Sequence, residues 1–347
     1  MKKLFIISYL LVVGIMELSA QIHAFCHTPA KSSNIDLNLS TLKSTTIEQN
    51  YILRIYVHVI RRSNGTGGQS VDDVETALSF LDSDFNPHGI YFSWDENIDY
   101  IDNDNYFDTP NTSIFSVNNH TDGIDIYLFD DDSEPFGLAN GVGMSSEMLV
   151  AGSIWDVPRY GSLVRSHVIS HEMGHVLFLW HTHHGTWFEA GVDTNQCAEL
   201  VDGSNSSTCG DYITDTPADP WLFDFNYTTC TWTEILTDAN GDIYNPDETL
   251  IMSYAPPDCM RRFSEEQANR MRNAIATLPF LQDVIIPCGE TVISNITITS
   301  DESYLNCVVT VLDASIENNA NVRINAINEL TIEKNFEAKI GSTFELK

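Results

Sequence analysis

Basic residues are scarce in this chain. Its 347 residues include 17 lysines and arginines against 49 aspartates and glutamates, for a formal net charge of −32. Such a charge repels nucleic acid and anionic membranes, so we expect neither as a partner, and it favours solubility and the binding of divalent cations. Hydrophobic residues still make up 43% of the chain, which is enough for one large domain or two modest ones.

Long apolar runs are missing after the first 20 residues. The chain begins with "MKKLFIISYLLVVGIMELSA", in which two lysines precede an apolar stretch and a small-residue end. We interpret residues 1–20 as a Sec-type signal peptide, because the apolar stretch is too short to span a membrane; a buried N-terminal helix is the alternative. Phe25 stands before Cys26, where a lipoprotein signal needs a small residue, so a lipid anchor is not indicated. We therefore expect a secreted, extracellular protein without a membrane span.

An even set of cysteines is also lacking. In an exported protein the seven cysteines are candidates for disulfides, and one must be left over. They stand at Cys26, Cys197, Cys209, Cys230, Cys259, Cys288 and Cys307. Four of them follow a histidine-rich motif and two lie near the C-terminus, so Cys26 is the odd one.

Strand and helix patterns alternate between residues 50 and 283, after a polar stretch at 21–49 that is typical of a leader or propeptide. We expect strands at 51–60, 89–94 and 123–129, a glycine-rich edge or loop at 137–144, and helices starting at Ser70, about Ser162 and Ser264. Ser264 with Gln267 fits a capping box, and Val74, Leu78, Leu81 and Phe85 form one apolar stripe. Loops fill most of the chain between the motif and Ser264. The pattern predicts an α+β domain built on a mixed, twisted sheet with a loop-rich lower part.

The composition changes again near residue 284. From there to 347 the chain shows short alternating strands with Asn and Gly turns and no helical period. We predict a small C-terminal all-β module, which is a candidate for surface or substrate contact.

The stretch "HEMGHVLFLWH" carries the chemistry. His171 and His175 lie four residues apart, so on a helix both imidazoles reach one metal, and Glu172 beside them can take a proton from a metal-bound water. A catalytic zinc needs a third protein ligand, and His181 is the obvious one. HExxH alone also occurs by chance. His167, one turn earlier, is interpreted as an ordinary helix residue.

Glycine is missing from the longer form of this pattern, HExxHxxGxxH, where this chain has Phe178. For His181 to turn back onto the metal, the helix must end abruptly between residues 175 and 181. Phe in the left-handed conformation required there costs about 1–2 kcal/mol. Zinc binding is worth on the order of 10 kcal/mol in small domains, so Phe178 strains the site without preventing it. Alternatively, the helix runs half a turn longer and the loop reshapes.

Several motifs in order resemble the pappalysin family of metzincin metallopeptidases, especially the secreted forms of Bacteroidetes-type bacteria. They are "SHEMGHVLFLWHTHHGT", "CGDYITDTPADP", "IMSYAPPDC" and "FSEEQANRM", spread over roughly residues 50 to 280. The resemblance implies a metzincin-like catalytic domain and a secreted zinc endopeptidase that acts on proteins or peptides. It also implies that His171, His175 and His181 bind Zn²⁺ and that Glu172 is the general base.

The resemblance further assigns residues around a methionine turn. Met252 would form the apolar floor under the metal, and Tyr254 would help stabilise the oxyanion. Asp258, four residues after the tyrosine, would lie in a partly desolvated pocket for the side chain after the scissile bond. A carboxylate there favours cleavage before Arg, with Lys second; otherwise Asp258 faces solvent or binds calcium.

Calcium is the second expected metal. Asp211, the carbonyl of Thr214, and Thr216 offer hard oxygen ligands, and the corresponding family loop binds calcium; the alternative is a solvated acidic turn. A weaker candidate is the run with Asp238, Asn240 and Asp242, since such runs are usually turns.

The four central cysteines allow three pairings. We favour Cys197 with Cys209, Cys230 with Cys259 and, in the tail, Cys288 with Cys307. Cys26 is then unpaired in the leader, where its thiolate could occupy the open zinc position and keep a zymogen latent. Asp36 could do the same.

Two other readings stay open. One is a catalytically impaired secreted binding or adhesion protein on a metalloprotease scaffold, with the tail as its working part. The other is a peptidase with two His ligands and a distant Glu, which His181 and Met252 disfavour.

Overall fold

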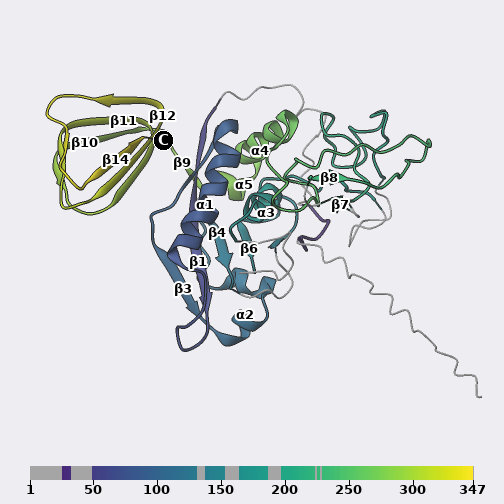
Figure 1. Ribbon diagram of the computed structural model, residues 1–347, viewed down its shortest axis with the longest axis horizontal. Coiled ribbons are helices and arrows are strands. Elements are labelled where there is room, and N and C mark those ends of the chain that lie inside the picture. Colours follow the sequence, from purple (N-terminus) through teal and green to yellow (C-terminus); the bar gives the residue numbers. More distant parts are fainter. Residues whose placement is uncertain are drawn as a thin grey trace, which may run out of the picture.

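The computed structural model describes residues 26–32, 49–130, 137–152, 164–186, 197–222, 225–226 and 229–346. The expected signal peptide lies outside these residues. The chain forms a seven-stranded mixed sheet with helices and, beside it, a separate five-stranded all-β sheet at the C-terminal end (Figure 1). The predicted α+β class is therefore confirmed.

The first sheet is built around the long strand β1 (Tyr51–Arg61). Its strand order is β2-β1-β4-β6-β5, and β3 also pairs with β1. The other strands are β2 (Ile90–Ser93), β3 (Ile98–Asp102), β4 (Ile124–Leu128), β5 (Gly137–Ala139) and β6 (Glu147–Val150). All of these pairs are parallel except β5 with β6, so β5 forms an antiparallel edge. The short strands β3 and β6 were not expected from the sequence.

The helices are α1 (Val71–Phe85), α2 (Asp104–Asp108), α3 (Val168–Val176), α4 (Glu265–Thr277) and α5 (Pro279–Gln282), with 3₁₀ turns at Asn86–His88 and Thr112–Ser116. Ser70 caps α1 and Ser264 caps α4, each in a full capping box, as the sequence predicts for Ser264 and Gln267. The helices of the described chain are too short or too polar to cross a bilayer.

Helix α3 starts later than expected. The prediction of a helix from about Ser162 fails because the described residues before Val168 form turns that are tied to α1 by their side chains. Arg165 forms ion pairs with Asp72 and Asp73. His167, the N-cap, bonds to a buried Asp84 with 2.7 Å between Nδ1 and Oδ2. Long-range contacts therefore override the local helical pattern.

Side chains of β1 alternate between two apolar layers. Ile55, Val57 and Val59 face a large core that includes α1, α3 and α4, whereas Ile60 faces a smaller one on the other side of the sheet. Both faces of the sheet are thus covered, and α3 lies on the side of the larger core.

A loop-rich region follows α3, as predicted. Its only described strands are β7 (Phe225–Asn226) and β8 (Thr231–Trp232). Disulfides join Cys197 with Cys209 and Cys230 with Cys259, which are the pairs favoured from the sequence. Here cross-links, rather than regular hydrogen bonding, hold the chain in place.

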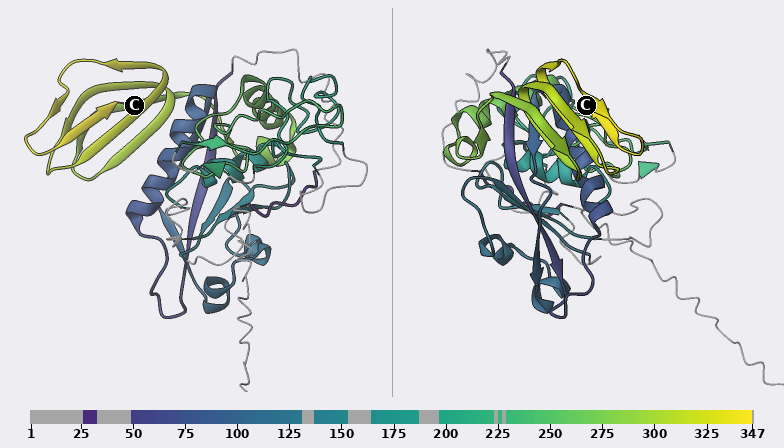
Figure 2. Two further views of the ribbon diagram at one scale, coloured as in Figure 1. Left: turned by 45° about the vertical axis from the view of Figure 1, so that its right-hand side comes forward. Right: turned by 90° about the vertical axis from the view of Figure 1, so that its left-hand side faces the viewer.

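The first sheet extends slightly past the expected boundary at 284. Strand β9 (Ile285–Ile286) pairs with β1 at Ile52 and Leu53, so the change of unit falls after Ile286. The C-terminal unit lies on the opposite side of the first sheet from the loop-rich region (Figures 1 and 2).

The C-terminal unit is a parallel coil. Its strands are β10 (Glu290–Ile298), β11 (Glu302–Ile316), β12 (Asn321–Ile332), β13 (Glu337–Ala338) and β14 (Thr343–Leu346), and every pairing among them is parallel. Glu290 pairs with Val308 and Asn321 with Thr343, so successive turns are 18 to 22 residues apart. Apolar side chains fill the interior, and a disulfide joins Cys288 with Cys307.

Candidate active site

Three histidines converge at the end of α3. His171 and His175 project from one face of the helix, with ring centroids 4.9 Å apart. The Nε2 atoms of His175 and His181 lie 3.0 Å apart. His171 Nδ1 donates to the Ile251 carbonyl at 2.6 Å and His175 Nδ1 donates to the Leu179 carbonyl at 2.8 Å, because a carbonyl can only accept. These bonds leave both Nε2 atoms to act as metal ligands.

The donor set fits a tetrahedral zinc ion. The Sγ atom of Cys26 lies 3.5 Å from His175 Nε2 and 3.4 Å from His181 Nε2. His171 completes this group of four side chains, and all four are buried. Tetrahedral zinc with nitrogen and sulfur ligands keeps its ligand atoms about 3.3–3.6 Å apart. Burial, followed by the neighbouring His175 and His181, holds the pKa of His171 well below its usual value. The imidazole is therefore neutral, as a metal ligand must be.

Phe178 is the residue that ends the helix. It adopts φ 75°, the left-handed conformation. The Leu179 N–H donates to the Gly174 carbonyl at 2.8 Å and the Phe178 N–H donates to the His175 carbonyl at 3.1 Å. These two bonds make a Schellman motif with Phe178 where glycine usually stands. The abrupt end predicted from the sequence is present despite the missing glycine.

Gly143 accommodates the ring of Phe178. A Cβ atom on Gly143 would lie 2.2 Å from Phe178 Cδ2, closer than any real contact, so the ring packs directly on the glycine backbone. The Gly143 N–H also donates to the His175 carbonyl at 2.8 Å. Phe178 is only 4% exposed, and this burial offsets its backbone strain.

Met252, the expected floor of the metal site, packs against α3 at Gly174. It is fully buried, and a Cβ on Gly174 would lie 2.4 Å from its sulfur, so Gly174 is required between the two helical histidines. The Met252 carbonyl accepts from the Thr182 N–H at 3.0 Å. The methionine turn therefore supports both the helix and the segment that carries His181.

Residues 26–32 lie along the edge strand β5. Cys26 pairs with Gly137, and Ser32 with Val142, in parallel bridges. The His27 N–H donates to the Gly137 carbonyl at 2.9 Å. Tyr254 Oη donates to the Cys26 carbonyl at 2.6 Å, so the hydroxyl points toward the histidines but is engaged by this segment.

Thr28 contacts the candidate general base. Its hydroxyl donates to Glu172 Oε2 at 2.7 Å and accepts from the Ala139 N–H at 2.7 Å. The sequence analysis missed this residue, and its only signal was proximity to Cys26. Glu172 is fully buried, and burial raises its pKa to about 8 although the Thr28 bond lowers it. Burial and the charge of Glu172 likewise raise the pKa of the Cys26 thiol.

Two of the expected calcium residues are in contact. Asp211 is buried and accepts from the Thr216 hydroxyl at 3.0 Å, while the Thr214 N–H and hydroxyl donate to Glu266. Glu199, which sequence reasoning missed, is buried nearby. Burial, followed by Asp211, raises the pKa of Glu199 to about 8, and burial raises that of Asp211 to about 7.

The weaker calcium candidate forms a turn. Asp238 accepts from the backbone N–H groups of Asn240 and Asp242, each at 2.9 Å, and Asp242 is exposed. This arrangement is the usual Asx turn. In the described chain, clusters of His, Cys, Asp and Glu suited to a metal occur at two places, and neither calcium candidate is among them.

Asp258 is exposed, so the expectation of a partly desolvated pocket is wrong in this structure. The residue follows two buried prolines and precedes the disulfide-bonded Cys259, and this rigid backbone turns the side chain outward. Asp36, the alternative latency residue, lies outside the described residues.

Comparison with solved structures finds similarities in fold, whereas the two comparisons by sequence find none. No family model matches the chain, and no curated protein matches it. The fold is similar to that of mature mirolysin from Tannerella forsythia, solved in complex with a cleaved peptide, at 15% sequence identity and a TM-score of 0.45. The match covers 69% of this chain and 99% of that one. At this level of similarity, any function must be argued from the site itself.

The turn at Phe178 gives a first prediction. Phe178→Gly relieves the left-handed strain but removes a buried ring, so we expect a loss of about 2 kcal/mol in the free energy of unfolding. Phe178→Ala removes the ring and keeps the strain, so its loss should be about 1 kcal/mol greater. Urea unfolding with zinc present measures both. An alanine variant as stable as the glycine variant would show that the turn is not strained.

Proposed function

We propose that this protein is a secreted zinc-dependent endopeptidase. The observation that carries the proposal is the convergence of His171, His175 and His181 with Glu172 beside them in a buried site. Zinc held by these histidines would polarise a substrate carbonyl and lower the pKa of a bound water. Glu172 would take the proton from that water and pass it to the leaving amine.

Tyr254 is proposed to act after residues 26–32 leave. Its ring lies 4.8 Å from that of His181, between centroids, and its hydroxyl is held by the Cys26 carbonyl. Release of that bond frees a donor close to the histidines, where it can stabilise the negative oxygen of the tetrahedral intermediate. Met252 supports the ligands from below.

We propose that the intact chain is a latent precursor. Residues 26–32 place a thiol beside two of the three histidines, a hydroxyl on Glu172, and a carbonyl on Tyr254. With zinc present, the Cys26 thiolate would complete a His₃Cys set and leave no position for water. Latency would therefore act on the metal and on the general base together.

Catalysis is tested by Glu172→Gln in the chain from which the leader has been removed. We expect wild type to cleave a denatured protein or peptide library and the variant to lose about 10²–10⁴-fold of that rate, because a general base is worth this much. Zinc content should stay the same. Glu75→Gln, an exposed glutamate on α1, is the matched control. A zinc-loaded wild type that cleaves nothing would favour the binding-protein reading.

Specificity is tested by aligning the cut sites. We propose cleavage before Arg, with Lys second, through Asp258. Because this carboxylate is exposed, salt screens it, and the preference should be about two- to fivefold and weaken at high ionic strength. Asp258→Asn should abolish the preference without lowering the overall rate. Cut sites with no basic enrichment, or enrichment that survives the substitution, would contradict this role.

Latency is tested in the intact precursor. Cys26→Ser removes the thiolate ligand and should raise the initial rate of peptide cleavage at least tenfold, since a serine hydroxyl is a poor zinc ligand. Thr28→Val keeps the shape but frees Glu172, and should shorten the time to activation. Ser32→Ala, in the same segment, is the control. The rate must be measured before the leader is cut, and mass spectrometry shows when that cut occurs. A Cys26→Ser precursor that stays fully latent would rule out the thiol as the cause of latency.

Calcium binding near Asp211 and Glu199 is also proposed, and it has a pH signature. Without a cation the folded state holds protons on these raised carboxyls that the unfolded state releases, so stability should fall as pH rises from about 4 to about 8. Calcium takes the place of these protons, and a hundredfold excess over Kd should raise Tm by about 5–10 °C at pH 8 but little at pH 5.

Asp211→Asn is the test variant for calcium binding. Asp202→Asn, at an exposed residue of the same region, is its matched control. Differential scanning calorimetry with and without a calcium-selective chelator measures the effect. An unchanged Tm at pH 8 would show that no calcium site of consequence exists.

A further inference from the structure

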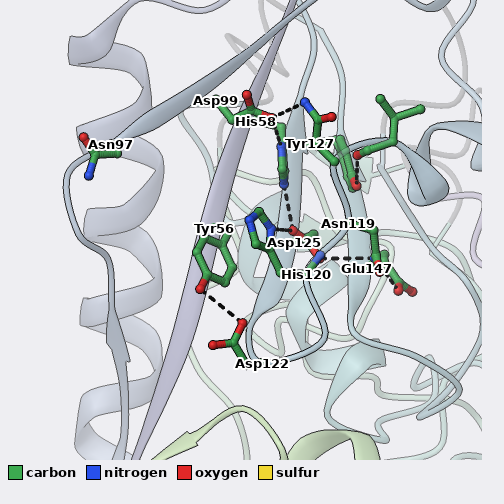
Figure 3. A network of polar contacts seen from close by, with 12 residues as sticks. Tyr56, His58, Asn97, Asp99, Asn119, His120, Asp122, Asp125, Tyr127 and Glu147 are labelled. Atoms are coloured by element: carbon green, nitrogen blue, oxygen red, sulfur yellow. Dashed lines mark hydrogen bonds and ion pairs between the residues drawn. The ribbon is translucent and has the colours of Figure 1, made fainter.

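A second cluster of metal-type side chains lies on the other face of the first sheet. His58 is on β1 and faces away from Val57 and Val59, which belong to the core shared with α3. Asp125 is on the neighbouring strand β4, and His120 is in the loop before it. Figure 3 shows the three side chains pointing toward one another.

The distances bring one carboxylate oxygen to two imidazoles. Asp125 Oδ1 lies 2.7 Å from His58 Nε2 and 2.7 Å from His120 Nδ1. One ligand atom from each of the three residues lies within 4.8 Å of the others. His58 and Asp125 are fully buried, whereas the His120 side chain is 35% exposed and borders a surface depression with Asn118 and Asn119. The cluster is thus both preformed and reachable.

Neighbouring groups orient each imidazole. Asp99 Oδ2 accepts from His58 Nδ1 at 2.8 Å, which directs Nε2 into the cluster, and Asn118 Nδ2 holds the same carboxylate oxygen at 2.7 Å. The ring of Tyr56 stacks on that of His120 with 3.5 Å between centroids. A carboxylate behind a histidine, with the other ring nitrogen facing inward, is the usual support for a metal ligand.

The charge at the cluster calls for a cation. Asp125 Oδ2 accepts from the backbone N–H of His120 at 2.9 Å and from the side-chain amide of Asn119. The same Asn119 amide donates to Glu147 at 2.8 Å. Burial and then the charges of Asp125, Glu147 and Asp99 raise the pKa of the adjacent Tyr127. Three carboxylates, those of Asp99, Asp125 and Glu147, thus gather around two imidazoles, and a divalent ion would balance their negative charge.

We propose that His58, His120 and Asp125 form a second site for a divalent transition-metal ion, best suited to Zn²⁺. Two imidazoles and one carboxylate are a common ligand set for this class of ion, and the surface depression supplies a water for the remaining position. The carboxylate oxygen lies 2.7 Å from each imidazole nitrogen, and these atoms need to separate by about 0.6–0.7 Å to hold tetrahedral zinc at about 2.0–2.2 Å. The ion would tie β1, β4 and the loop before β4 together, so its role is structural.

The test uses the full chain without its α3 site. After removal of metal, His171→Ala/His181→Ala is titrated with Zn²⁺ and then with Co²⁺. We expect one equivalent of zinc, a rise in Tm, and a cobalt spectrum without a thiolate band. Adding His120→Asn should remove the ion and the rise in Tm, although the asparagine amide can still donate to Asp125. Adding His88→Asn, a histidine outside both clusters, should change neither.

Each result decides the proposal. No zinc bound by the double variant, or zinc that persists after His120→Asn, would overturn it, as would a thiolate band, which would place the ion at Cys26 instead. If His120→Asn does not fold, zinc-edge absorption on the double variant still distinguishes two imidazoles with oxygen from a sulfur-containing shell. Wild type should bind two equivalents. The proposed peptidase activity depends on the other ion and can fail or succeed independently.

Discussion

The left-handed turn at Phe178 is the constraint on which the active-site region depends. It ends α3 within a residue or two of His175 and so returns the chain to bring His181 within 3.0 Å of it. The Phe178 ring leaves no room for a side chain at Gly143, and the Met252 sulfur leaves none at Gly174. The convergence of the histidines is therefore a property of backbone geometry supported from two sides by close packing. A side chain added at either glycine would therefore displace the segments that carry the histidines.

The edge strand β5 links this geometry to residues 26–32. Strand edges offer unpaired backbone groups, and here residues 26–32 use them. Gly137 also lets Glu172 of α3 approach this strand closely, because a Cβ there would lie 2.3 Å from Glu172 Oε1. The same short strand thus borders Glu172 and receives an extended segment. An extended peptide that replaced residues 26–32 would meet the same donors and acceptors.

Sequence reasoning succeeded where the determining contacts are local. The N-cap at Ser70, the capping box at Ser264 and the strand patterns around β1, β2 and β4 were readable because neighbouring residues decide them. The start of α3 was not, since Arg165 and His167 bond to α1, far away in the chain. The exposure of Asp258 was misjudged because it depends on how a proline-rich loop packs.

The candidate site divides along the same line. Its histidines are spaced within one motif: His171 and His175 are one turn apart on a helix, and His181 follows after the turn that ends it. Thr28 reaches Glu172 across a long stretch of sequence, and no local pattern marks it. Glu199 is close to Asp211 in the sequence, but it lies in a loop region without a regular period. The cluster of His58, His120 and Asp125 joins a strand, a loop and a second strand. Its members become neighbours only through the parallel pairing of β1 with β4.

The parallel coil of the C-terminal unit has a consequence for how the protein can change over time. Each strand bonds to the strand one turn away, so most contacts are with neighbouring turns. Gain or loss of a whole turn of about twenty residues would preserve the stacking on both sides of the change. The length of the coil can therefore drift in evolution, and with it the reach of whatever the coil touches, while the histidine site keeps its shape.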